Sequence, residues 1–353
     1  MKIIHIINSL KKGGAEGNLY RLCKFQKKKY KKSIDITIIT LIANGFYEEE
    51  LKKLDIKILS LNLSKQIKFY NFIKKIFILR SIIKRINPDV IQGWMYHSNF
   101  ITLFIPKKFY DKLFWNIRHA ELSAKFSKKK TILLSVICGL LSKTIPQKII
   151  YCSEKSIKFH ENQHFYSKNK SSLIYNGYSD KSYYSSRYLR SDFRTRNEIK
   201  KSDIIIGYAG RYAKQKNIDT MLSAFSKITK KYNNVYLYMV GKDINVHNKK
   251  LTSKVKNLQV YQKVIFLNER KNLLDFYNGI DFLLLASHSE SFPNVVAESM
   301  LCSTPVLSSN AGCSKKIINR YGFVMNKNDF ESIYKSLNRT IIFYKNKKKS
   351  GNY

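Results

Sequence analysis

The sequence has no run of about 18 uninterrupted apolar residues, the length a membrane-spanning helix needs. Its longest candidate, TILLSVICGLL, is far too short. The opening MKIIHIINSL lacks the length and the small-residue cleavage site of a signal peptide, and it favours a first strand. The five cysteines are scattered and mostly lie inside apolar runs. They indicate reduced thiols in a cytoplasmic chain, without metal-ligand spacing.

Several motifs of phosphate chemistry and hydrolysis are also missing. The chain has no Asp-X-Asp pair for a metal-bridged diphosphate, no Gly-X-X-X-X-Gly-Lys loop and no Gly-X-Ser-X-Gly elbow. No recognised nucleic-acid-binding module occurs. Any phosphate that the protein binds must then be neutralised by Arg, Lys and a helix N-terminus, so we expect neither a metal nor a cofactor.

Acidic residues are scarce: 24 Asp and Glu stand against 65 Lys and Arg, a formal net charge of +41. Such an excess suits nucleic acid or an anionic membrane. The chain is also rich in Ile, Asn, Tyr and Phe, which AT-rich coding sequences favour together with Lys, so drift explains much of the excess. No nucleic-acid partner is expected. Residues 66–86, QIKFYNFIKKIFILRSIIKRI, place apolar and lysine faces at helical spacing, which predicts peripheral contact with an anionic membrane.

Apolar strand candidates alternate with amphipathic stretches along the chain, which is 44% hydrophobic and 13% aromatic. This alternation predicts an α/β fold with parallel sheets covered by helices on both faces, and the length suits two domains. We expect Rossmann-like domains over residues 1–180 and 181–335, joined by a polar linker with a short helix. Residues 336–353 are expected to form a C-terminal helix and basic tail that can pack back on the N-terminal domain.

The strand candidates are KIIHIIN, IDITIITL, IKILSL, PDVIQGW, KLFWNIR, QKIIYC and SSLIYN in the first half, and DIIIGYAG, NVYLYMVG, KVIFLN, IDFLLLAS, TPVLSS and GFVM in the second.

The stretch ASHSESFPNVVAESM, residues 286–300, places two glutamates, Glu290 and Glu298, around Phe292 and Pro293. Pro293 suits the first position of a helix, which predicts that Glu290 precedes the helix and that Glu298 lies in its second turn. A buried strand comes before this loop, and open α/β sheets hold their ligands at such a place. The alternative is an ordinary helix start with one solvated glutamate.

The N–H groups of Asn294, Val295 and Val296 would point out of this helix N-terminus beside the first glutamate. Free N–H groups at a helix start bind anions. The stretch therefore predicts a phosphate seat with one carboxylate before it and one behind it.

Other strand ends carry further candidates. Gly13 and Gly14 follow the first strand and open a helix, where a phosphate can approach closely, although an ordinary tight turn explains them equally. Arg211 and Lys216 follow the first strand of the second half and would face the phosphate seat, since both loops lie at one sheet edge. A solvated basic loop is the alternative there. In NIRHAEL, His119 ends a first-half strand, where a substrate contact and a structural role are equally expected.

The stretch HENQH, from His160 to His164, matches the His-Glu-X-X-His pattern of zinc peptidases, with Glu161 as a potential base. Position 170, where one class of these enzymes has a third histidine, is Lys170. No downstream Glu motif supplies a ligand. We interpret this stretch as a solvated, peripheral helix, with a zinc hydrolase as a distant alternative.

Together these elements resemble glycosyltransferase family 4, the retaining GT-B enzymes that use nucleotide sugars. The resemblance spans nearly the whole chain and rests on KKGGAE, NIRH, AGRYAKQKN and SESFPNVVAESM, in that order. The last fits E-x-F-P-N-x-x-x-E, the most specific mark of the family. WMYHSN and NIRHAEL are similar to the branch that builds capsule, O-antigen or exopolysaccharide. The resemblance implies a GT-B fold, with two Rossmann-like domains facing a central cleft.

The resemblance also implies roles for the candidate residues. Arg211 and Lys216 would grip the donor diphosphate, Glu298 would accept hydrogen bonds from the ribose hydroxyls, and Glu290 would contact the transferred sugar. His119 would touch this sugar close to the reacting carbon. The implied catalytic residues are His119, Glu290, Arg211 and Lys216, and the implied donor-binding residues are Gly13, Gly14, Arg211, Lys216, Glu290, Phe292, Pro293, Asn294, Val295 and Glu298.

The implied reaction is front-face transfer, in which the leaving phosphate takes the acceptor's proton. The expected donor is a nucleotide sugar, with UDP as the nucleotide most usual in the family. The expected acceptor is a lipid-linked or other glycan. The expected location is cytoplasmic, peripheral on the inner face of the cell membrane.

The rival hypothesis is a non-catalytic GT-B scaffold or sugar-binding protein at the membrane, and two stretches depart from the family pattern. NAGCSKKII stands where relatives have DVGxxxEII, so Lys315 and Lys316 replace small or acidic positions. LIYNGYSD replaces I-P-N-G-[IVF]-D. A scaffold would be expected to lose the diphosphate cations, and both are present, which favours the enzyme.

Overall fold

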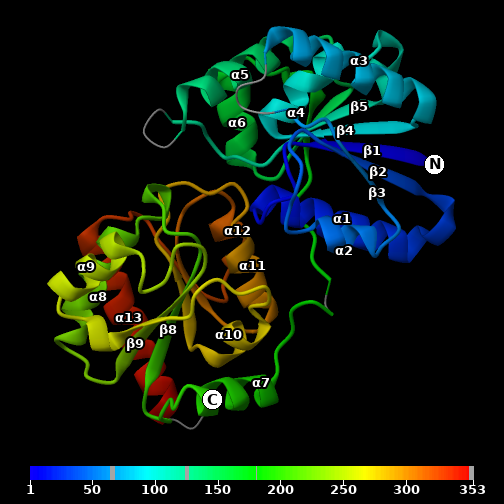
Figure 1. The fold of residues 1–353 in the computed structure, drawn as a ribbon. Helices are drawn as coiled ribbons and strands as arrows, with labels where there is room; N and C mark the ends of the chain where they lie inside the picture. Colours follow the sequence, from blue (N-terminus) through cyan, green and yellow to red (C-terminus); the bar gives the residue numbers. More distant parts are fainter. Residues whose placement is uncertain (64–67, 124–126, 180, 350–353) are drawn as a thin grey trace. The chain divides into compact units, whose positions relative to one another are not determined.

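Two parallel sheets organise the chain, as the repeated alternation of apolar and amphipathic stretches predicts. The computed structural model describes residues 1–63, 68–123, 127–179 and 181–349. The chain divides into two compact units, which we name unit 1 (Met1–Gly177) and unit 2 (Tyr178–Tyr353) (Figure 1). The polar linker expected from the sequence begins where unit 1 ends.

In order along the chain, unit 1 contains β1 (Lys2–Ile7), α1 (Gly14–Tyr30), a 3-10 turn (Lys31–Ser33), β2 (Asp35–Thr40), α2 (Glu48–Lys52), β3 (Lys57–Ser60), α3 (Phe69–Ile86), β4 (Val90–Trp94), α4 (Met95–Ile101), 3-10 turns (Thr102–Phe104 and Lys107–Lys112), β5 (Leu113–Ile117), α5 (Lys129–Leu141), β6 (Lys148–Tyr151), α6 (Glu154–Gln163), a 3-10 turn (Lys168–Lys170) and β7 (Ser171–Leu173).

Unit 2 contains α7 (Arg187–Arg196), β8 (Ile204–Ala209), a 3-10 turn (Lys214–Lys216), α8 (Ile218–Thr229), β9 (Val235–Val240), α9 (Lys249–Asn257), a 3-10 turn (Tyr261–Lys263), β10 (Val264–Phe266), α10 (Leu274–Gly279), β11 (Phe282–Leu285), α11 (Asn294–Leu301), β12 (Val306–Ser309), α12 (Ser314–Ile318), β13 (Phe323–Met325) and α13 (Phe330–Lys349).

Each sheet has the strand order of a doubly wound fold. The order is β3-β2-β1-β4-β5-β6-β7 in unit 1 and β10-β9-β8-β11-β12-β13 in unit 2. All pairs are parallel; for example, Ile4 of β1 lies opposite Thr37 of β2. The order reverses next to β1 and next to β8, and ligands bind at such reversals, beyond the carboxyl ends of the strands. The predicted α/β fold with two parallel sheets is confirmed.

Two hydrophobic clusters show which helices cover each face of the sheet in unit 1. One cluster joins Ile4 and Ile6 of β1 to α3, α4 and α5. The other joins Ile7 of β1 and Ile36 of β2 to α1 and α2. Alternate residues of a strand point to opposite faces, so both faces need apolar side chains, and β1 reads KIIHII for this reason.

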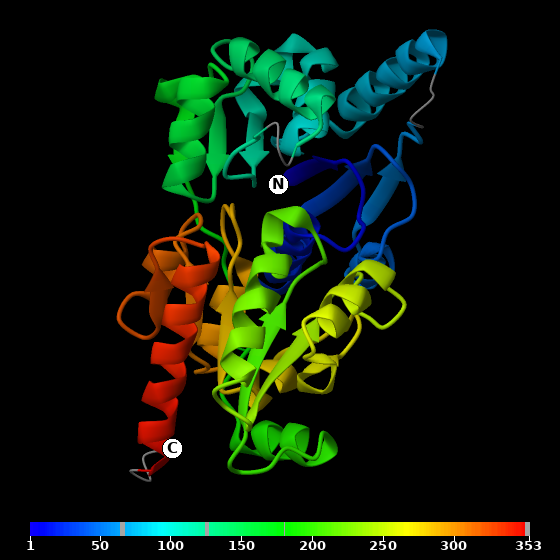
Figure 2. The same cartoon turned by 90° about the vertical axis from the view of Figure 1, so that its left-hand side faces the viewer.

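The C-terminal helix packs within unit 2. The buried side chains of α13 share one core with α8, and they are Ile333, Leu337, Ile341 and Tyr344. Figure 2 shows α13 (red) beside α8. The described part of residues 336–353 thus belongs to the core of unit 2, and packing against the N-terminal domain stays a prediction. These side chains recur at helical spacing, which gives α13 an apolar stripe that its own unit covers.

A buried ion pair fixes the linker helix α7 to unit 2. The Asp281 carboxylate, fully buried, accepts a hydrogen bond of 2.6 Å from Arg190 Nη2 and one of 2.7 Å from the backbone N–H of Ile205. Arg194 Nη1 approaches the same carboxylate at 3.5 Å. A buried carboxylate requires such partners, so α7 closes the start of unit 2.

Candidate functional site

Two loops of unit 2 meet where its strand order reverses. One follows β8 and carries Arg211 and Lys216, and the other follows β11 and carries Glu290. Backbone and side-chain hydrogen bonds join the loops: the N–H of His288 donates to the carbonyl of Gln215 at 2.9 Å, and Gln215 Nε2 donates to the carbonyl of Ser289 at 2.7 Å. The predicted cations and the first predicted glutamate therefore lie at one sheet edge.

Lys216 and Glu290 form an ion pair across these loops. Lys216 Nζ lies 2.5 Å from Glu290 Oε1, and the two side chains are only 17% and 13% exposed. Partial burial strengthens the attraction relative to a surface pair, and it holds the ammonium group at the sheet edge. The solvated-loop alternative is therefore wrong for Lys216, whereas the Arg211 side chain is exposed.

The buried Tyr208 lies near the end of β8, just before the loop that carries Arg211 and Lys216. Its hydroxyl donates to the carbonyl of Arg211 at 3.2 Å, which fixes the backbone of that residue. Burial raises the pKa of Tyr208, the negative charge of Glu290 raises it further, and the positive charge of Arg211 opposes both effects. The Tyr208 hydroxyl therefore stays protonated and remains a hydrogen-bond donor.

Gly312, in the loop after β12, supports the backbone of the glutamate loop. Its φ is +59°, in the left-handed region, and a Cβ there would lie 2.2 Å from the carbonyl oxygen of Ser291 and 2.3 Å from that of Glu290. The next N–H, of Cys313, donates to the carbonyl of Ser291 at 3.1 Å. Only glycine fits this position without moving Glu290.

We expect Gly312→Ala to destabilise unit 2 by about 2–4 kcal/mol, because the methyl group adds a steric clash to an unfavourable φ. Urea unfolding followed by circular dichroism measures this change. Gly177→Ala is the matched control, since a Cβ at Gly177 would meet nothing within 4 Å. Equal stabilities of the two variants would contradict the supporting role of Gly312.

Glu298 is held in place by a buried tyrosine. The Glu298 side chain lies in the second turn of α11, and the residue is 8% exposed. The Tyr277 hydroxyl donates to Glu298 Oε2 at 2.8 Å. Burial and the adjacent carboxylate raise the pKa of Tyr277 well above its usual value, so the hydroxyl remains a donor. One carboxylate oxygen is therefore anchored, which sets the direction of the other.

The start of α11 differs slightly from the expectation. Pro293 is the N-cap, with φ −74° and ψ 94°, so it lies one residue before the first helical position. The N–H of Val296 donates to the carbonyl of Pro293 at 3.0 Å and is not available to an anion, which corrects the prediction for this group. Asn294 and Val295 keep their place in the first turn of the helix.

Tyr178 organises this helix start from the beginning of unit 2. Its hydroxyl donates to Asn294 Oδ1 at 2.7 Å, and its ring stacks on Phe292 with centroids 6.4 Å apart. Tyr183 makes edge contacts with both Tyr178 and Tyr277. A chain of three tyrosines thus links the Phe-Pro-Asn turn to the partner of Glu298.

The remaining predicted residues lie at the carboxyl edge of the sheet in unit 1. Gly13 is the N-cap of α1 and Gly14 its first residue. A Cβ on Gly13 would lie 2.3 Å from Glu16 Oε2, so the Glu16 carboxylate lies against the helix start where a phosphate was expected. Burial raises the pKa of Glu16. Because this side chain is flexible, it can turn away from an incoming anion.

His119 is exposed just after β5, and it lies over a buried histidine and tyrosine cluster. Its ring centroid is 5.7 Å from that of Tyr96, and its carbonyl accepts a hydrogen bond of 2.5 Å from Ser156 Oγ. The neighbouring Arg118 lies over the ring of Trp94, with the guanidinium carbon 5.3 Å from the centroid. His119 is thus the member of this segment that can reach a substrate.

Both histidines of HENQH are buried, so the interpretation as a solvated helix is wrong for them, whereas Asn162 and Gln163 are exposed. His160 is 0% and His164 is 4% exposed. His160 Nδ1 lies 2.7 Å from the carbonyl oxygen of Ser156, which can only accept, so Nδ1 carries the proton. Nε2 then accepts from the Tyr96 hydroxyl at 2.7 Å. Both ring nitrogens are occupied by protein groups, which argues against the zinc hydrolase. Across the described ranges, no three His, Cys, Asp or Glu side chains gather as a metal site.

Burial lowers the pKa of His160 to about 3 and that of His5 to about 4. Both values lie below the ordinary 6.5, so the unfolded state binds more protons between these limits and stability falls as the pH falls. Between pH 7 and pH 5 we expect unit 1 to lose about 2 kcal/mol for each histidine. Trp94 and Trp115, the two tryptophans, are both buried in unit 1, so their fluorescence reports its urea unfolding.

His247→Gln is the control for this prediction, because His247 is exposed in unit 2. It should leave the difference between pH 7 and pH 5 unchanged. Equal unfolding free energies of unit 1 at the two pH values would contradict the buried neutral histidines.

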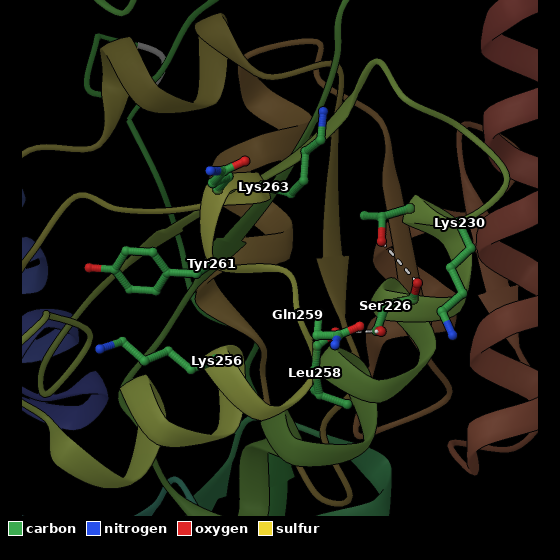
Figure 3. A pocket seen from close by; sticks show the side chains of 9 residues that line it. Ser226, Lys230, Lys256, Leu258, Gln259, Tyr261 and Lys263 are labelled. Atoms are coloured by element: carbon green, nitrogen blue, oxygen red, sulfur yellow. Dashed lines mark hydrogen bonds between the residues drawn. The ribbon is translucent and has the colours of Figure 1, made fainter.

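A hollow of about 560 Å³ in unit 2 lies away from the candidate residues. It is formed by the end of α8, the end of α9 and the turn before β10, at the amino edge of the sheet. Lys230, Lys256 and Lys263 line it, but their ammonium groups point in different directions (Figure 3). Because these cations do not converge on one point, we assign the hollow no role.

Sequence reasoning missed three supporting residues, Tyr178, Tyr277 and Gly312. Tyr277 lies inside an apolar run, LLDFYNGID, where a tyrosine is indistinguishable from a core residue. Tyr178 and Gly312 fall in the two stretches that depart from the family pattern, NGYSD and NAGCSKK. A polar side chain at a position that is usually apolar was the available signal for Tyr178.

Lys315 and Lys316 are exposed on α12.

The chain is similar to known glycosyltransferases. Residues 190–353 match the family model described as "Glycosyl transferases group 1". The capsular polysaccharide biosynthesis glycosyltransferase CapM of Staphylococcus aureus is 27% identical over 147 residues, which are 41% of this chain and 38% of CapM. The O-antigen biosynthesis glycosyltransferase WclY of Escherichia coli is 28% identical over 141 residues, 40% of this chain and 38% of WclY. The matched regions thus span well under half of these relatives.

Solved structures show a similarity that covers nearly the whole chain. HepE from Anabaena, in complex with UDP and glucose, has a TM-score of 0.80 and 18% sequence identity, and the match covers 97% of this chain and 90% of HepE. At this identity the comparison shows the fold alone. The chain therefore has the GT-B fold, and residues 190–353 are similar to the group 1 glycosyl transferases.

Proposed function

We propose that this protein is a retaining glycosyltransferase that moves a sugar from a nucleoside diphosphate to a lipid-linked or other glycan in surface polysaccharide synthesis. The observation that supports this most is the arrangement in unit 2. Lys216, paired with Glu290, lies in the loop after β8, where the strand order reverses. Glu298, anchored by Tyr277, lies on α11, which follows β11, the strand next to β8 in the sheet. The names of the relatives support the class of product.

In this proposal the donor diphosphate draws Lys216 away from Glu290. The ion pair keeps the ammonium group in position before the donor arrives, and the diphosphate offers more negative charge than one carboxylate. Glu290 is then released to accept hydrogen bonds from hydroxyls of the sugar. Arg211, exposed beside it, adds a second cation. The two cations stabilise the charge that develops on the leaving phosphate.

Glu298 would hold the nucleoside. Tyr277 anchors its Oε2, and in this proposal its carboxylate accepts hydrogen bonds from the ribose hydroxyls. The first turn of α11, at Asn294 and Val295, contributes N–H groups for the donor phosphate or sugar. We propose UDP as the nucleotide, which the complexes of HepE with UDP-glucose support by analogy.

We also propose that the transfer is independent of a metal, because Lys216 and Arg211 can neutralise the diphosphate. The sequence has no Asp-X-Asp pair, and Arg and Lys side chains lie where the diphosphate would be neutralised. Because Glu290 is assigned to the sugar hydroxyls and not to attack on the anomeric carbon, we propose front-face transfer with the leaving phosphate as the base. The donor roles of His119, Gly13 and Gly14 in unit 1 stay predictions from the family resemblance.

A donor-turnover assay tests this function. The protein is incubated with UDP-, GDP- and ADP-sugars in the presence of EDTA, with water as the default acceptor, and release of the nucleoside diphosphate is measured. We expect release from one of these donor classes, with retained anomeric configuration of the sugar in NMR spectra. Inverted configuration would overturn the retaining mechanism, and activity only after addition of a divalent metal would overturn metal independence.

A further inference from the structure

Helix α3 of unit 1 exposes an unusual amount of apolar surface. Phe69 is 78%, Tyr70 is 74% and Phe77 is 67% exposed, and these are three of the four most exposed large apolar side chains of the described chain. Ile73 and Ile78, at 38% each, extend the same helix surface. We call these five residues the α3 face. Figure 2 shows the first turns of α3 standing clear of the rest of unit 1.

The packing of α3 does not explain this surface. Leu79 and Ile83 are buried against the sheet, and Phe72 and Ile76 pack against the same core. The helix is therefore apolar on the side that unit 1 covers and again on a side that the described chain leaves open. An ordinary surface helix is charged or polar on its open side. Contiguous exposed apolar groups of this kind mark interaction sites.

Charge distinguishes the kind of partner. Residues 56–88, which contain α3, include eight Lys and Arg and no acidic residue. Lys68 and Lys74 are exposed beside the α3 face. Compositional drift accounts for extra lysine on any surface, but it does not account for exposed phenylalanines between the lysines. Aromatic side chains flanked by lysines match a surface that is apolar beneath an anionic layer.

Helix α5 repeats the pattern on the same side of the sheet. Leu133 is 61% and Leu140 is 58% exposed. Residues 122–153, which contain α5, include six lysines and no acidic residue. Since one core cluster contains the buried sides of both α3 and α5, both helices cover the same face of the sheet. Two separate helices with this pattern suit a broad surface better than a peptide, which fills one groove.

We propose that the α3 face docks unit 1 on an anionic lipid bilayer, with Phe69, Tyr70 and Phe77 inserted at the level of the headgroups and the neighbouring lysines on anionic lipids. No helix among the residues that the structure describes is long and apolar enough to cross a membrane, so the contact is peripheral. The docking extends the proposed function and rests on it for its purpose, which is access to a lipid-linked acceptor.

Vesicle co-sedimentation at physiological salt tests the docking. The probes are vesicles of phosphatidylcholine alone and vesicles of phosphatidylcholine with phosphatidylglycerol. A triple variant, Phe69→Ser with Tyr70→Ser and Phe77→Ser, keeps the net charge, so unspecific attraction of a basic protein to anionic lipid stays the same. We expect wild type to prefer the anionic vesicles and the triple variant to bind them at least tenfold more weakly.

The matched control is the double variant Phe25→Ser with Tyr30→Ser on α1. These aromatics are 56% and 44% exposed beside several lysines, but α1 covers the opposite face of the sheet. This control should bind vesicles like wild type. Equal binding of wild type and the triple variant would overturn the proposal, as would a loss confined to the α1 variant.

A dimer that forms through α3, seen as a concentration-dependent mass in analytical ultracentrifugation and lost in the triple variant, would also overturn the docking, because a second copy would then cover the face. UDP binding without vesicles separates this proposal from the proposed function. The triple variant should bind UDP like wild type, whether or not it binds lipid.

Discussion

Replacing Lys216 with alanine should lower kcat/KM for donor turnover about 10²–10³-fold, the usual cost of removing one preorganised charge that stabilises a leaving group. The ammonium group is 2.5 Å from Glu290 in the free protein, so it is already held in position when the donor binds. Arg211→Ala should have a similar effect, because the second cation acts on the same diphosphate. Both variants should remain folded in circular dichroism.

Two further variants make the Lys216 prediction specific. Lys214→Ala removes an exposed cation from the same 3-10 turn and should leave turnover unchanged. Lys216→Arg keeps the charge and should retain part of the activity, since its longer and planar group fits the position less well. Near-normal turnover in Lys216→Ala would contradict the assignment of the diphosphate site.

Glu298→Gln should raise the KM for the donor about 10- to 100-fold, which corresponds to the loss of one charge-assisted hydrogen bond of about 1.5–3 kcal/mol. The amide can still accept from Tyr277, so the local packing is kept while the negative charge on the ribose contact is lost. The effect should therefore appear in donor affinity and not in the urea unfolding of unit 2.

Tyr277→Phe is the companion variant. It removes the 2.8 Å hydrogen bond to Glu298 Oε2 and leaves the carboxylate in place but less well fixed. We expect a smaller rise in KM than in Glu298→Gln, together with a loss of stability of about 1 kcal/mol. An unchanged KM in Glu298→Gln would show that this carboxylate does not hold the nucleoside.

The fold followed from the sequence because its signal is periodic and local. Each strand candidate, from KIIHIIN to GFVM, contains an observed strand, since parallel strands buried on both faces must be apolar nearly throughout. The short helices α2 and α4 were not anticipated. Helices of this length carry too few turns to show an amphipathic period, and their position is set by packing.

The sequence predicted those parts of the site that lie at strand ends and at glycine-containing turns. Placing Lys216 and Glu290 at one edge required only the rule that parallel strands end together, but their pairing depends on loop geometry that no short motif encodes. For the HENQH stretch, the composition gave a wrong prediction of exposure. His160 looked solvated because the helix is polar by composition, yet its side chain is satisfied inside the core by Tyr96 and Ser156.

Equilibrium binding of UDP, GDP and ADP in the presence of EDTA, measured by titration calorimetry on wild type and Glu298→Ala, tests the central claim most directly. We expect wild type to bind one of these diphosphates, UDP in our proposal, without metal, and the variant to bind it at least tenfold more weakly. No binding of any of the three to wild type would contradict the account, and the GT-B scaffold would then be the better description of this protein.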